Sequence, residues 1–153
     1  MTTVRLATPA DSAALVRLRA EMFAAIGQDV GAEDAPWRAA ARAWFEGAVD
    51  GAALVAVAEE PGAGVVASAM AVLLPRAPSP EDPSASSAHV SQVSTLPGHR
   101  RRGHARACLR LLLDELERRG VVRADLHATA EGDALYRGLG FTEPAHPALR
   151  RRV

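Results

Sequence analysis

The chain has no lysine and no asparagine, one isoleucine and one cysteine among its 153 residues. With Cys108 alone, an internal disulfide and a zinc site built from several cysteines are both excluded. The apolar runs are only a few residues long, so the sequence offers no candidate transmembrane helix. Arginine is the only strong base and alanine is abundant, a bias typical of a GC-rich bacterial coding sequence.

The charges of the chain balance. Lys plus Arg is 18 and Asp plus Glu is 18, so the formal net charge is zero. A dedicated nucleic-acid binder usually carries a basic excess, so this balance argues against that class. The first ten residues have neither the basic start nor the apolar stretch of a secretory signal peptide. We therefore expect a cytoplasmic protein with no membrane and no nucleic-acid partner, and the length predicts a single domain over residues 1–153.

Hydrophobic periodicity and turn residues predict a mixed order of strands and helices. Strands are expected at 4–7, 53–58, 65–74, 89–96 and 122–128, with a last strand at 148–152, and helices are expected at 11–26, 35–49, 103–119 and 132–139. The strand–helix–strand unit at 89–128 requires its two strands to be parallel. Segment 75–88 is rich in Pro, Ser, Glu and Asp, which predicts a mobile surface loop, either a lid over a site or a hairpin extension.

The stretch that says most about chemistry is the basic turn 100–106, Arg-Arg-Arg-Gly-His-Ala-Arg, between a predicted strand and a predicted helix. Gly103 removes a side chain where a ligand would approach the backbone, and Ala105 is small. The first amides of a helix have no internal partner, and the helix dipole adds partial positive charge there. Amides, dipole and arginines together suit a pyrophosphate. A solvated turn that caps a helix and an arginine-rich nucleic-acid patch are the two alternatives.

Two motifs of the chain resemble the GNAT superfamily of acyl-CoA-dependent N-acetyltransferases. The family signature, Gln/Arg-x-x-Gly-x-Gly/Ala, reads Arg100-x-x-Gly103-x-Ala105 here, and the block Leu-Tyr-x-x-Leu-Gly-Phe occupies 135–141. The order of elements from residue 4 onward is also family-like, so the resemblance covers nearly the whole chain. It implies an α/β fold with a mixed, centrally splayed sheet flanked by helices on both faces.

The resemblance implies acetyl-CoA as co-substrate, with no metal and no covalent enzyme intermediate. The fourth and fifth strands splay apart in that family, so the backbone at the end of the fourth strand would bind the pantetheine arm, and the basic turn would bind the pyrophosphate. Thr129 stands where the family often has an asparagine that contacts the cofactor. The cofactor-binding residues implied in this way are Val93, Ser94, Thr95, Arg100, Arg101, Arg102, Gly103, His104, Ala105, Arg106 and Thr129.

Tyr136 is the only tyrosine of the chain, and it matches the residue that commonly protonates the departing thiolate in the family. A phenol has a reference pKa of about 10, so it can donate a proton at neutral pH. The alternative is an ordinary core aromatic on a short helix. The resemblance therefore makes Tyr136 the candidate general acid.

The candidate general base is His89, eleven residues before the first position of the signature, where other branches of the family keep a Glu or a His. An imidazole titrates near neutral pH and suits this role. A period of two along the strand predicts that His89 shares one face with Val93, toward the cofactor. A solvent-facing histidine at the start of a strand is the alternative, and His127, Glu59 and Glu60 are weaker candidates.

The resemblance implies direct transfer of an acetyl group to an amine, and we expect a small-molecule acceptor. Transfer to a protein or peptide is one alternative, although Ala124 stands where one group of such enzymes has a Glu, and a non-catalytic acyl-CoA-binding module is another. The acceptor pocket would be built from the first two helices, loop 75–88 and the last strand, with Trp37 and Trp44 either lining it or packing in the core. A homodimer would be in keeping with a family in which dimers are common.

Overall fold

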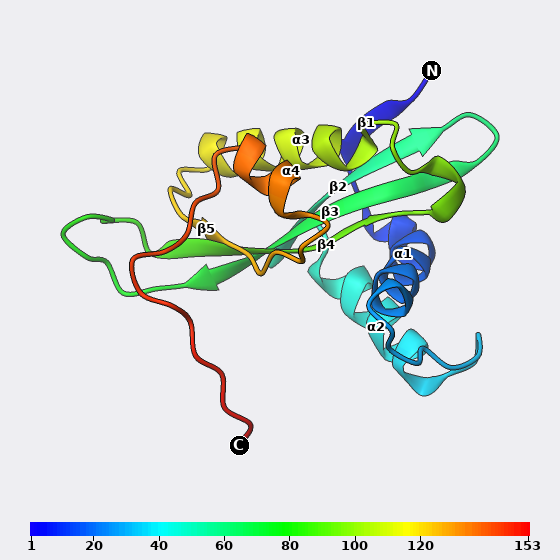
Figure 1. Cartoon of the computed structure of the whole chain (residues 1–153), viewed down its shortest axis with the longest axis horizontal. Helices are drawn as coiled ribbons and strands as arrows, with labels where there is room; N and C mark the ends of the chain where they lie inside the picture. Colours follow the sequence, from blue (N-terminus) through cyan, green and yellow to red (C-terminus); the bar gives the residue numbers. More distant parts are fainter.

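The computed structural model describes all 153 residues and contains one five-stranded sheet in the order β1-β2-β3-β4-β5 (Figure 1). Its elements are β1 (Thr3–Leu6), a 3-10 turn (Pro9–Asp11), α1 (Ser12–Ala25), α2 (Pro36–Ala48), β2 (Ala53–Glu60), β3 (Gly64–Pro75), β4 (Ser86–Thr95), a second 3-10 turn (Pro97–His99), α3 (His104–Arg118), β5 (Ala124–Asp125) and α4 (Asp133–Gly138). Strands β1 to β4 pair antiparallel, whereas β4 and β5 are parallel. The predicted mixed α/β fold is confirmed. None of the helices is long and apolar enough to cross a bilayer.

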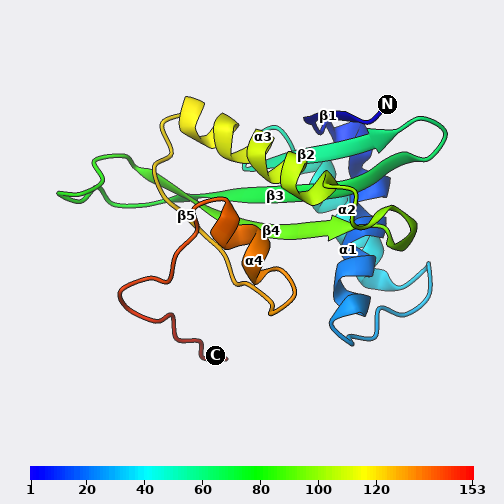
Figure 2. The same ribbon diagram turned by 45° about the horizontal axis from the view of Figure 1, so that its top comes forward.

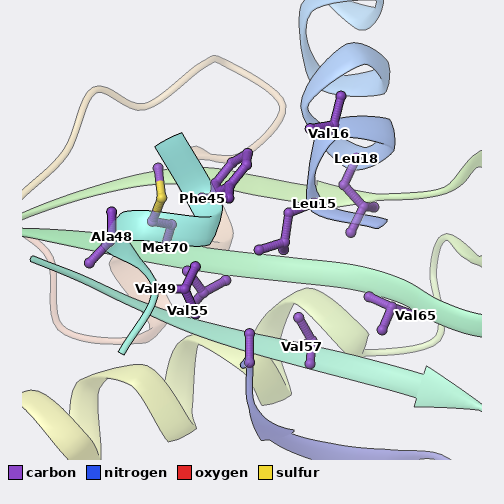
Figure 3. Packing of buried hydrophobic residues seen from close by; sticks show 12 residues of the cluster. Leu15, Val16, Leu18, Phe45, Ala48, Val49, Val55, Val57, Val65 and Met70 are labelled. Atoms are coloured by element: carbon purple, nitrogen blue, oxygen red, sulfur yellow. The ribbon is translucent and has the colours of Figure 1, made fainter. Parts of the chain in front are cut away.

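Two hydrophobic cores lie on opposite faces of the sheet, one under α1 and α2 and the other under α3 (Figure 2). In the first, side chains from α1 and α2 meet those of the central strands; the largest contributors are Leu15, Leu18, Phe45, Val55, Val57 and Met70 (Figure 3). In the second, the apolar stripe of α3 lies on a sheet surface made mostly of alanine; its members include Cys108, Leu109, Leu112, Leu116, Ala56, Ala67, Ala69 and Ala71. Each fully buried leucine contributes about 1.5–3 kcal/mol, so α3 is fixed firmly above the sheet.

A β-bulge interrupts the middle of β4. The pairing of β4 with β3 shifts by one residue between Ser91 and Ser94. Gln92, inside this step, has a φ of 49°, in the left-handed region. A bulge inserts one extra residue, so the alternation of side chains changes phase across it.

The bulge puts on opposite faces of the sheet two side chains that the period of two along the strand predicts to share one face. His89 pairs with Val72, which packs on the core under α1 and α2. Val93 packs on the core under α3, and Thr95 pairs with Ala67 of that same core. Directly opposed residues of paired strands point to one face, so His89 lies on the α1–α2 face, and Val93 and Thr95 lie on the α3 face. The prediction that His89 and Val93 share a face is therefore wrong.

Strands β4 and β5 separate soon after they pair. Their register covers only Ala88 with Ala124 and His89 with Asp125. After Asp125 the chain forms no further strand, so residues 90–95 of β4 have no neighbouring strand on their outer side. This confirms the expected central splay, and it leaves backbone groups of one strand edge unpaired by the sheet.

One predicted strand is absent from the structure, and the strand expected at 122–128 is shortened to Ala124–Asp125. Residues 142–153 contain no helix or strand, so the last strand expected at 148–152 is wrong. The tail includes three consecutive arginines at 150–152, and all of its residues are exposed, so it packs no apolar face on the sheet. Segment 75–88 is a hairpin extension, because β3 continues to Pro75 and pairs there with Ser86, which leaves 76–85 as the loop at one end of the molecule (Figure 1).

Candidate functional site

The basic turn joins the open edge of β4 to the first turn of α3. Arg101 and Gly103 both adopt left-handed backbone conformations, with φ of 64° and 81°. Gly103 precedes the helix, and its carbonyl accepts the first helical hydrogen bond from the Ala107 amide, at 3.0 Å. No protein atom lies within 4 Å of the position that a Gly103 side chain would take. The turn therefore presents open space in front of the first amides of a helix, the geometry that binds anions.

The arginines of the turn take different positions. Arg100 folds back, and its Nε donates to the Thr95 carbonyl at 3.1 Å, which closes the turn onto β4. Arg101 is exposed, and Arg106 lies beside α4, where a side chain added to Gly138 would come within 3.7 Å of its guanidinium. Their charges surround the start of α3 and add to the field of the helix dipole.

One carboxylate ties both ends of this turn to the sheet. The two oxygens of Glu60, at the end of β2, lie 2.9 Å from His99 Nδ1 and 2.6 Å from His104 Nε2, and Arg102 Nη1 lies 3.3 Å from the same carboxylate. Each imidazole donates an N–H to it. Burial alone would raise the pKa of Glu60, but the hydrogen bonds from His104 and His99 outweigh burial and lower that pKa. Glu60 is therefore a carboxylate at neutral pH and anchors the turn.

The side chains of His99 and His104 both face this carboxylate. The His104 side chain is only 7% exposed and faces Glu60, so the backbone of residue 104 is what remains for a ligand at the start of α3. The carboxylate that holds it lies 44 residues earlier in the chain. No local pattern in the sequence links the two positions.

The bulge of β4 is fixed to α1 by buried hydrogen bonds. Gln92 Nε2 donates to the Leu15 carbonyl at 2.9 Å, and Ser94 Oγ donates to the Leu18 carbonyl at 2.8 Å. Arg19 Nη1 donates to Gln92 Oε1 at 3.2 Å. Since the side chain of Ser94 is used by α1, only the backbone of Ser94 can serve a ligand on the open edge.

Two histidines singled out as candidate bases lie side by side. The ring centroids of His89 and His127 are 5.6 Å apart, with an angle of 56° between the rings. His89 is partly buried and His127 is exposed, just beyond β5. The splay thus leaves His127 beside His89, and His127 is the more exposed of the two rings.

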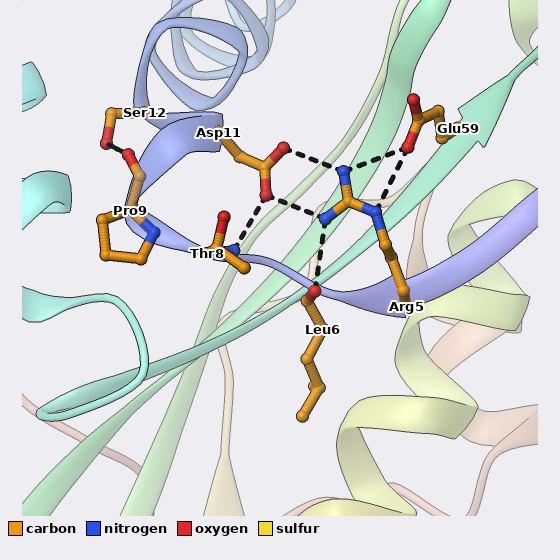
Figure 4. Close-up of polar contacts among 7 residues, drawn as sticks. All are labelled: Arg5, Leu6, Thr8, Pro9, Asp11, Ser12 and Glu59. Carbon is orange, nitrogen blue, oxygen red and sulfur yellow. Dashed lines mark hydrogen bonds and ion pairs between the residues drawn. The ribbon is translucent and has the colours of Figure 1, made fainter.

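The two carboxylates considered as bases lie at the other end of the sheet. Glu59 accepts from Arg5 at 3.0 Å, and Arg5 is also bonded to both oxygens of Asp11 (Figure 4). Glu60 is engaged by the two histidines of the turn. The β3 partners of Glu60 and His89, Gly64 and Val72, are eight positions apart along the strand, a span of roughly 25 Å. Both carboxylates are therefore committed to structure, far from His89.

Tyr136 packs on the α3 side of the sheet. Its ring meets Phe141 edge-on, with centroids 6.0 Å apart, and it borders the same core as Val93. A side chain at Gly132 would come within 2.8 Å of the ring, so glycine is required there. Burial raises the pKa of Tyr136, which keeps the phenol protonated at neutral pH. Thr129 Oγ1 accepts from the Gly132 amide at 3.3 Å and so helps to begin α4, a role that sequence reasoning missed.

The other reactive or aromatic side chains are less well placed to take part in catalysis or in binding the acceptor. Cys108 is fully buried in α3, and burial raises the pKa of its thiol to about 12, so it is a poor nucleophile. Trp37 packs against Phe23 and donates to the Val30 carbonyl at 2.8 Å, which favours the packing role, whereas Trp44 stays exposed. The chain contains no group of three or more His, Cys, Asp and Glu side chains arranged to hold a metal ion.

Comparison with known proteins places this arrangement in a family. The family model described as "Acetyltransferase (GNAT) family" matches residues 14–141. No curated protein matches the sequence.

Three solved structures show the same fold. A predicted acetyltransferase from Clostridium acetobutylicum, solved with acetyl-CoA, is 20% identical with a TM-score of 0.84, over 99% of this chain and 96% of that one. A GCN5-related N-acetyltransferase from Ralstonia eutropha is 26% identical with a TM-score of 0.80, over 99% of both chains. A ribosomal-protein-alanine N-acetyltransferase from Brucella melitensis is 20% identical with a TM-score of 0.74, over 100% of both chains. The protein described here belongs to the GNAT acetyltransferase family and is an acyltransferase.

Proposed function

We propose that this protein transfers an acetyl group from acetyl-CoA directly to the amine of a small acceptor. The observation that carries the proposal is the continuity between the open β4 edge at 90–95 and the first turn of α3. A pantetheine arm laid along that edge as an added strand would deliver its pyrophosphate to the amides at 101–106. The structure from Clostridium acetobutylicum, solved with acetyl-CoA, supports the choice of donor.

The bulge suggests how donor and acceptor approach each other. Val93 and Thr95 lie on the α3 face, the side on which Tyr136 also packs. His89 lies on the α1–α2 face. We assign the donor to the open edge beside Tyr136, and the acceptor to the α1–α2 side beside His89.

The chemistry then divides between two side chains. The amine nitrogen attacks the thioester carbonyl, its new C–N bond forms, and the C–S bond breaks to release a thiolate. Tyr136 donates its phenolic proton to that thiolate, since burial keeps the phenol protonated. His89 takes the proton lost by the amine, directly or through one water, and His127 can carry it onward. Backbone groups of Val93, Ser94 and Thr95 and the hydroxyl of Thr129 orient the donor.

The choice of a small acceptor has one support in the sequence. Ala124 stands where one group of protein-acetylating members has a Glu, which disfavours the mechanism of that group.

The composition of the chain, with arginine as its only strong base and abundant alanine, supports a bacterial source.

The decisive experiment follows thiol release from acetyl-CoA with a panel of small amines and with a peptide bearing a free N-terminus. Release that depends on a small amine, with no release on the peptide, is expected. Release on the peptide alone would reverse the acceptor class. Binding of acetyl-CoA with no amine-dependent release would make the protein an acyl-CoA-binding module instead.

A further inference from the structure

One partly buried arginine has no acidic partner. Three arginines of the chain are partly buried: Arg5, Arg19 and Arg38. Arg5 is paired with two carboxylates, and Arg38 lies 3.9 Å from Glu33. Arg19 alone makes no ion pair within 4 Å. A guanidinium withdrawn from water without a counter-charge is costly, so its presence calls for an explanation.

Arg19 is held only by neutral groups. Its Nη1 donates to Gln92 Oε1 at 3.2 Å, and its guanidinium carbon lies 4.9 Å from the centre of the Phe23 ring. A guanidinium carries five N–H donors in a planar fork, and the contact with Gln92 uses one. The aromatic face and the amide orient the fork without neutralising it. Burial lowers the pKa of Arg19, but the group remains a cation at neutral pH. It can therefore still bind a carboxylate or phosphate through two parallel hydrogen bonds.

The position of Arg19 relates it to the reaction. Gln92, its hydrogen-bond partner, is the bulge residue in the middle of the open β4 edge. Gln92 points to α1, the same side of the sheet as His89. Arg19 is therefore one side chain away from the strand that would present the thioester, on the side assigned to the acceptor.

We propose that Arg19 binds an anionic group of the acceptor, so that the substrate class is a small amine that also carries a carboxylate or a phosphate. This inference rests on the proposed function. The acid of the substrate supplies the counter-charge that the chain itself does not give to Arg19, and the bidentate contact directs the amine toward the β4 edge and His89. Carboxylate and phosphate share this recognition chemistry.

The test uses amines in matched pairs that differ in the acidic group. Glucosamine 6-phosphate is compared with glucosamine, and methionine and phenylalanine with their amides. Calorimetric titration in the presence of CoA measures binding, and thiol release from acetyl-CoA measures turnover. We expect the acidic member of at least one pair to bind ten or more times tighter. A preference within the glucosamine pair would show that Arg19 binds phosphate, and a preference within an amino-acid pair would show that it binds carboxylate.

Three variants make the result specific. Arg19→Gln should reduce the preference for the acidic member to less than threefold, while acetyl-CoA binds as in the wild type. Arg19→Lys keeps the charge but not the fork, and should retain part of the preference, which also covers a failure of Arg19→Gln to fold. Arg17→Gln, on the same helix, is the matched control: its guanidinium donates to the Val65 carbonyl at 3.0 Å rather than to Gln92, so this variant should keep the full preference.

The two proposals fail in different ways. Equal binding of both members of every pair, or a preference that survives Arg19→Gln, would overturn the role of Arg19 whatever the turnover. Arg19-dependent binding of an acidic amine without any thiol release would support the anion site and contradict the proposed transferase reaction.

Discussion

Glu60 shows how a single side chain can set the shape of a binding turn. Its two oxygens hold histidines from both ends of the turn, so the backbone between them has little freedom. The carboxylate also places a negative charge behind a turn whose front must attract phosphate. We therefore assign Glu60 a positioning role that acts through His99 and His104.

Removing this anchor should weaken the binding of acetyl-CoA without changing the chemical step. We expect Glu60→Ala to raise the KM for acetyl-CoA about tenfold with kcat within about threefold of the wild type, because the turn loses its order but Tyr136 and His89 do not move. Glu60→Gln, which can still accept one imidazole N–H, should recover part of the loss. Glu59→Ala is the control. Glu59 is bonded to Arg5 rather than to the histidines of the turn, so this variant should leave the KM for acetyl-CoA unchanged. A fall in kcat equal to the rise in KM would contradict the assignment.

Tyr136 offers a cleaner test of a chemical role. Tyr136→Phe keeps the ring against Phe141 and Gly132 and removes only the proton donor. A positioned acid contributes about 10²–10⁴-fold, and water can replace part of it, so kcat should fall by roughly 10–10³. Acetyl-CoA affinity, measured by calorimetry, should be nearly unchanged. Wild-type kcat in this variant would reduce Tyr136 to a packing residue.

Among the helices and strands, β4 contributes most to the candidate site. Its first half pairs on both sides, and its second half pairs on one side only. The bulge between them turns His89 and Val93 to opposite faces. One strand therefore serves two sides of a reaction, with donor contacts on one and a candidate base on the other.

This arrangement makes a specific prediction for His89. If His89 is the base, kcat/KM should fall with unit slope as acid protonates the imidazole, and His89→Gln should remove that limb and lower the plateau at least tenfold. Acetyl-CoA affinity should stay within a few-fold, because the proposed donor contacts lie beyond the bulge. His127→Gln is the companion variant and should reduce the rate less, since His127 is the outer of the two rings. An unaltered pH–rate profile in His89→Gln would exclude it as the base.

Much of the element order could be predicted, because the signals are local. The leucines of α3 recur at helical spacing, and the β2–β3 hairpin is bounded by turn residues. The tail at 142–153 misled the prediction, because the residues of a short segment that ends in three arginines do not show whether a sheet edge is there to receive it.

The site was less predictable, because its decisive contacts join distant residues. The motif located the turn, and the space that a Gly103 side chain would occupy is open, as a ligand approaching the backbone requires. The bulge could not be predicted, since Gln92 is held by a carbonyl 77 residues earlier in the chain. The anchoring of the turn by Glu60 and the pairing of His89 with His127 are likewise products of the tertiary fold.

For the whole molecule, the ion pairs predict how stability depends on pH. Hydrogen bonds from Arg5 lower the pKa of Asp11 from 3.8, and hydrogen bonds from Arg118 and Arg119 lower that of Glu115 from 4.5 to about 2. At Glu60, burial acts in the opposite direction, but the two histidines prevail and the pKa is also lowered. The folded state thus binds fewer protons than the unfolded state in this range.

The stability contributed by these carboxylates is complete above the unfolded pKa values and is lost as the pH falls through the folded ones. We expect the midpoint of urea unfolding to be constant from about pH 7 to 5 and to decrease steadily from pH 4.5 toward 2. A midpoint that rises as the pH falls from 5 to 3 would show that these pairs do not favour the folded state.

The central claim is that the β4–α3 turn holds the pyrophosphate of acetyl-CoA, and calorimetric titration of Gly103→Asp against Gly120→Asp tests it most directly. Both glycines have positive φ, 81° and 77°, and both have open space where a side chain would lie. They stand at opposite ends of α3. Each variant adds one negative charge at a glycine of similar φ, but only Gly103 faces the proposed phosphate site. We predict wild-type affinity for acetyl-CoA in Gly120→Asp and a loss of at least about 100-fold in Gly103→Asp; equal affinity in the two variants would contradict the assignment.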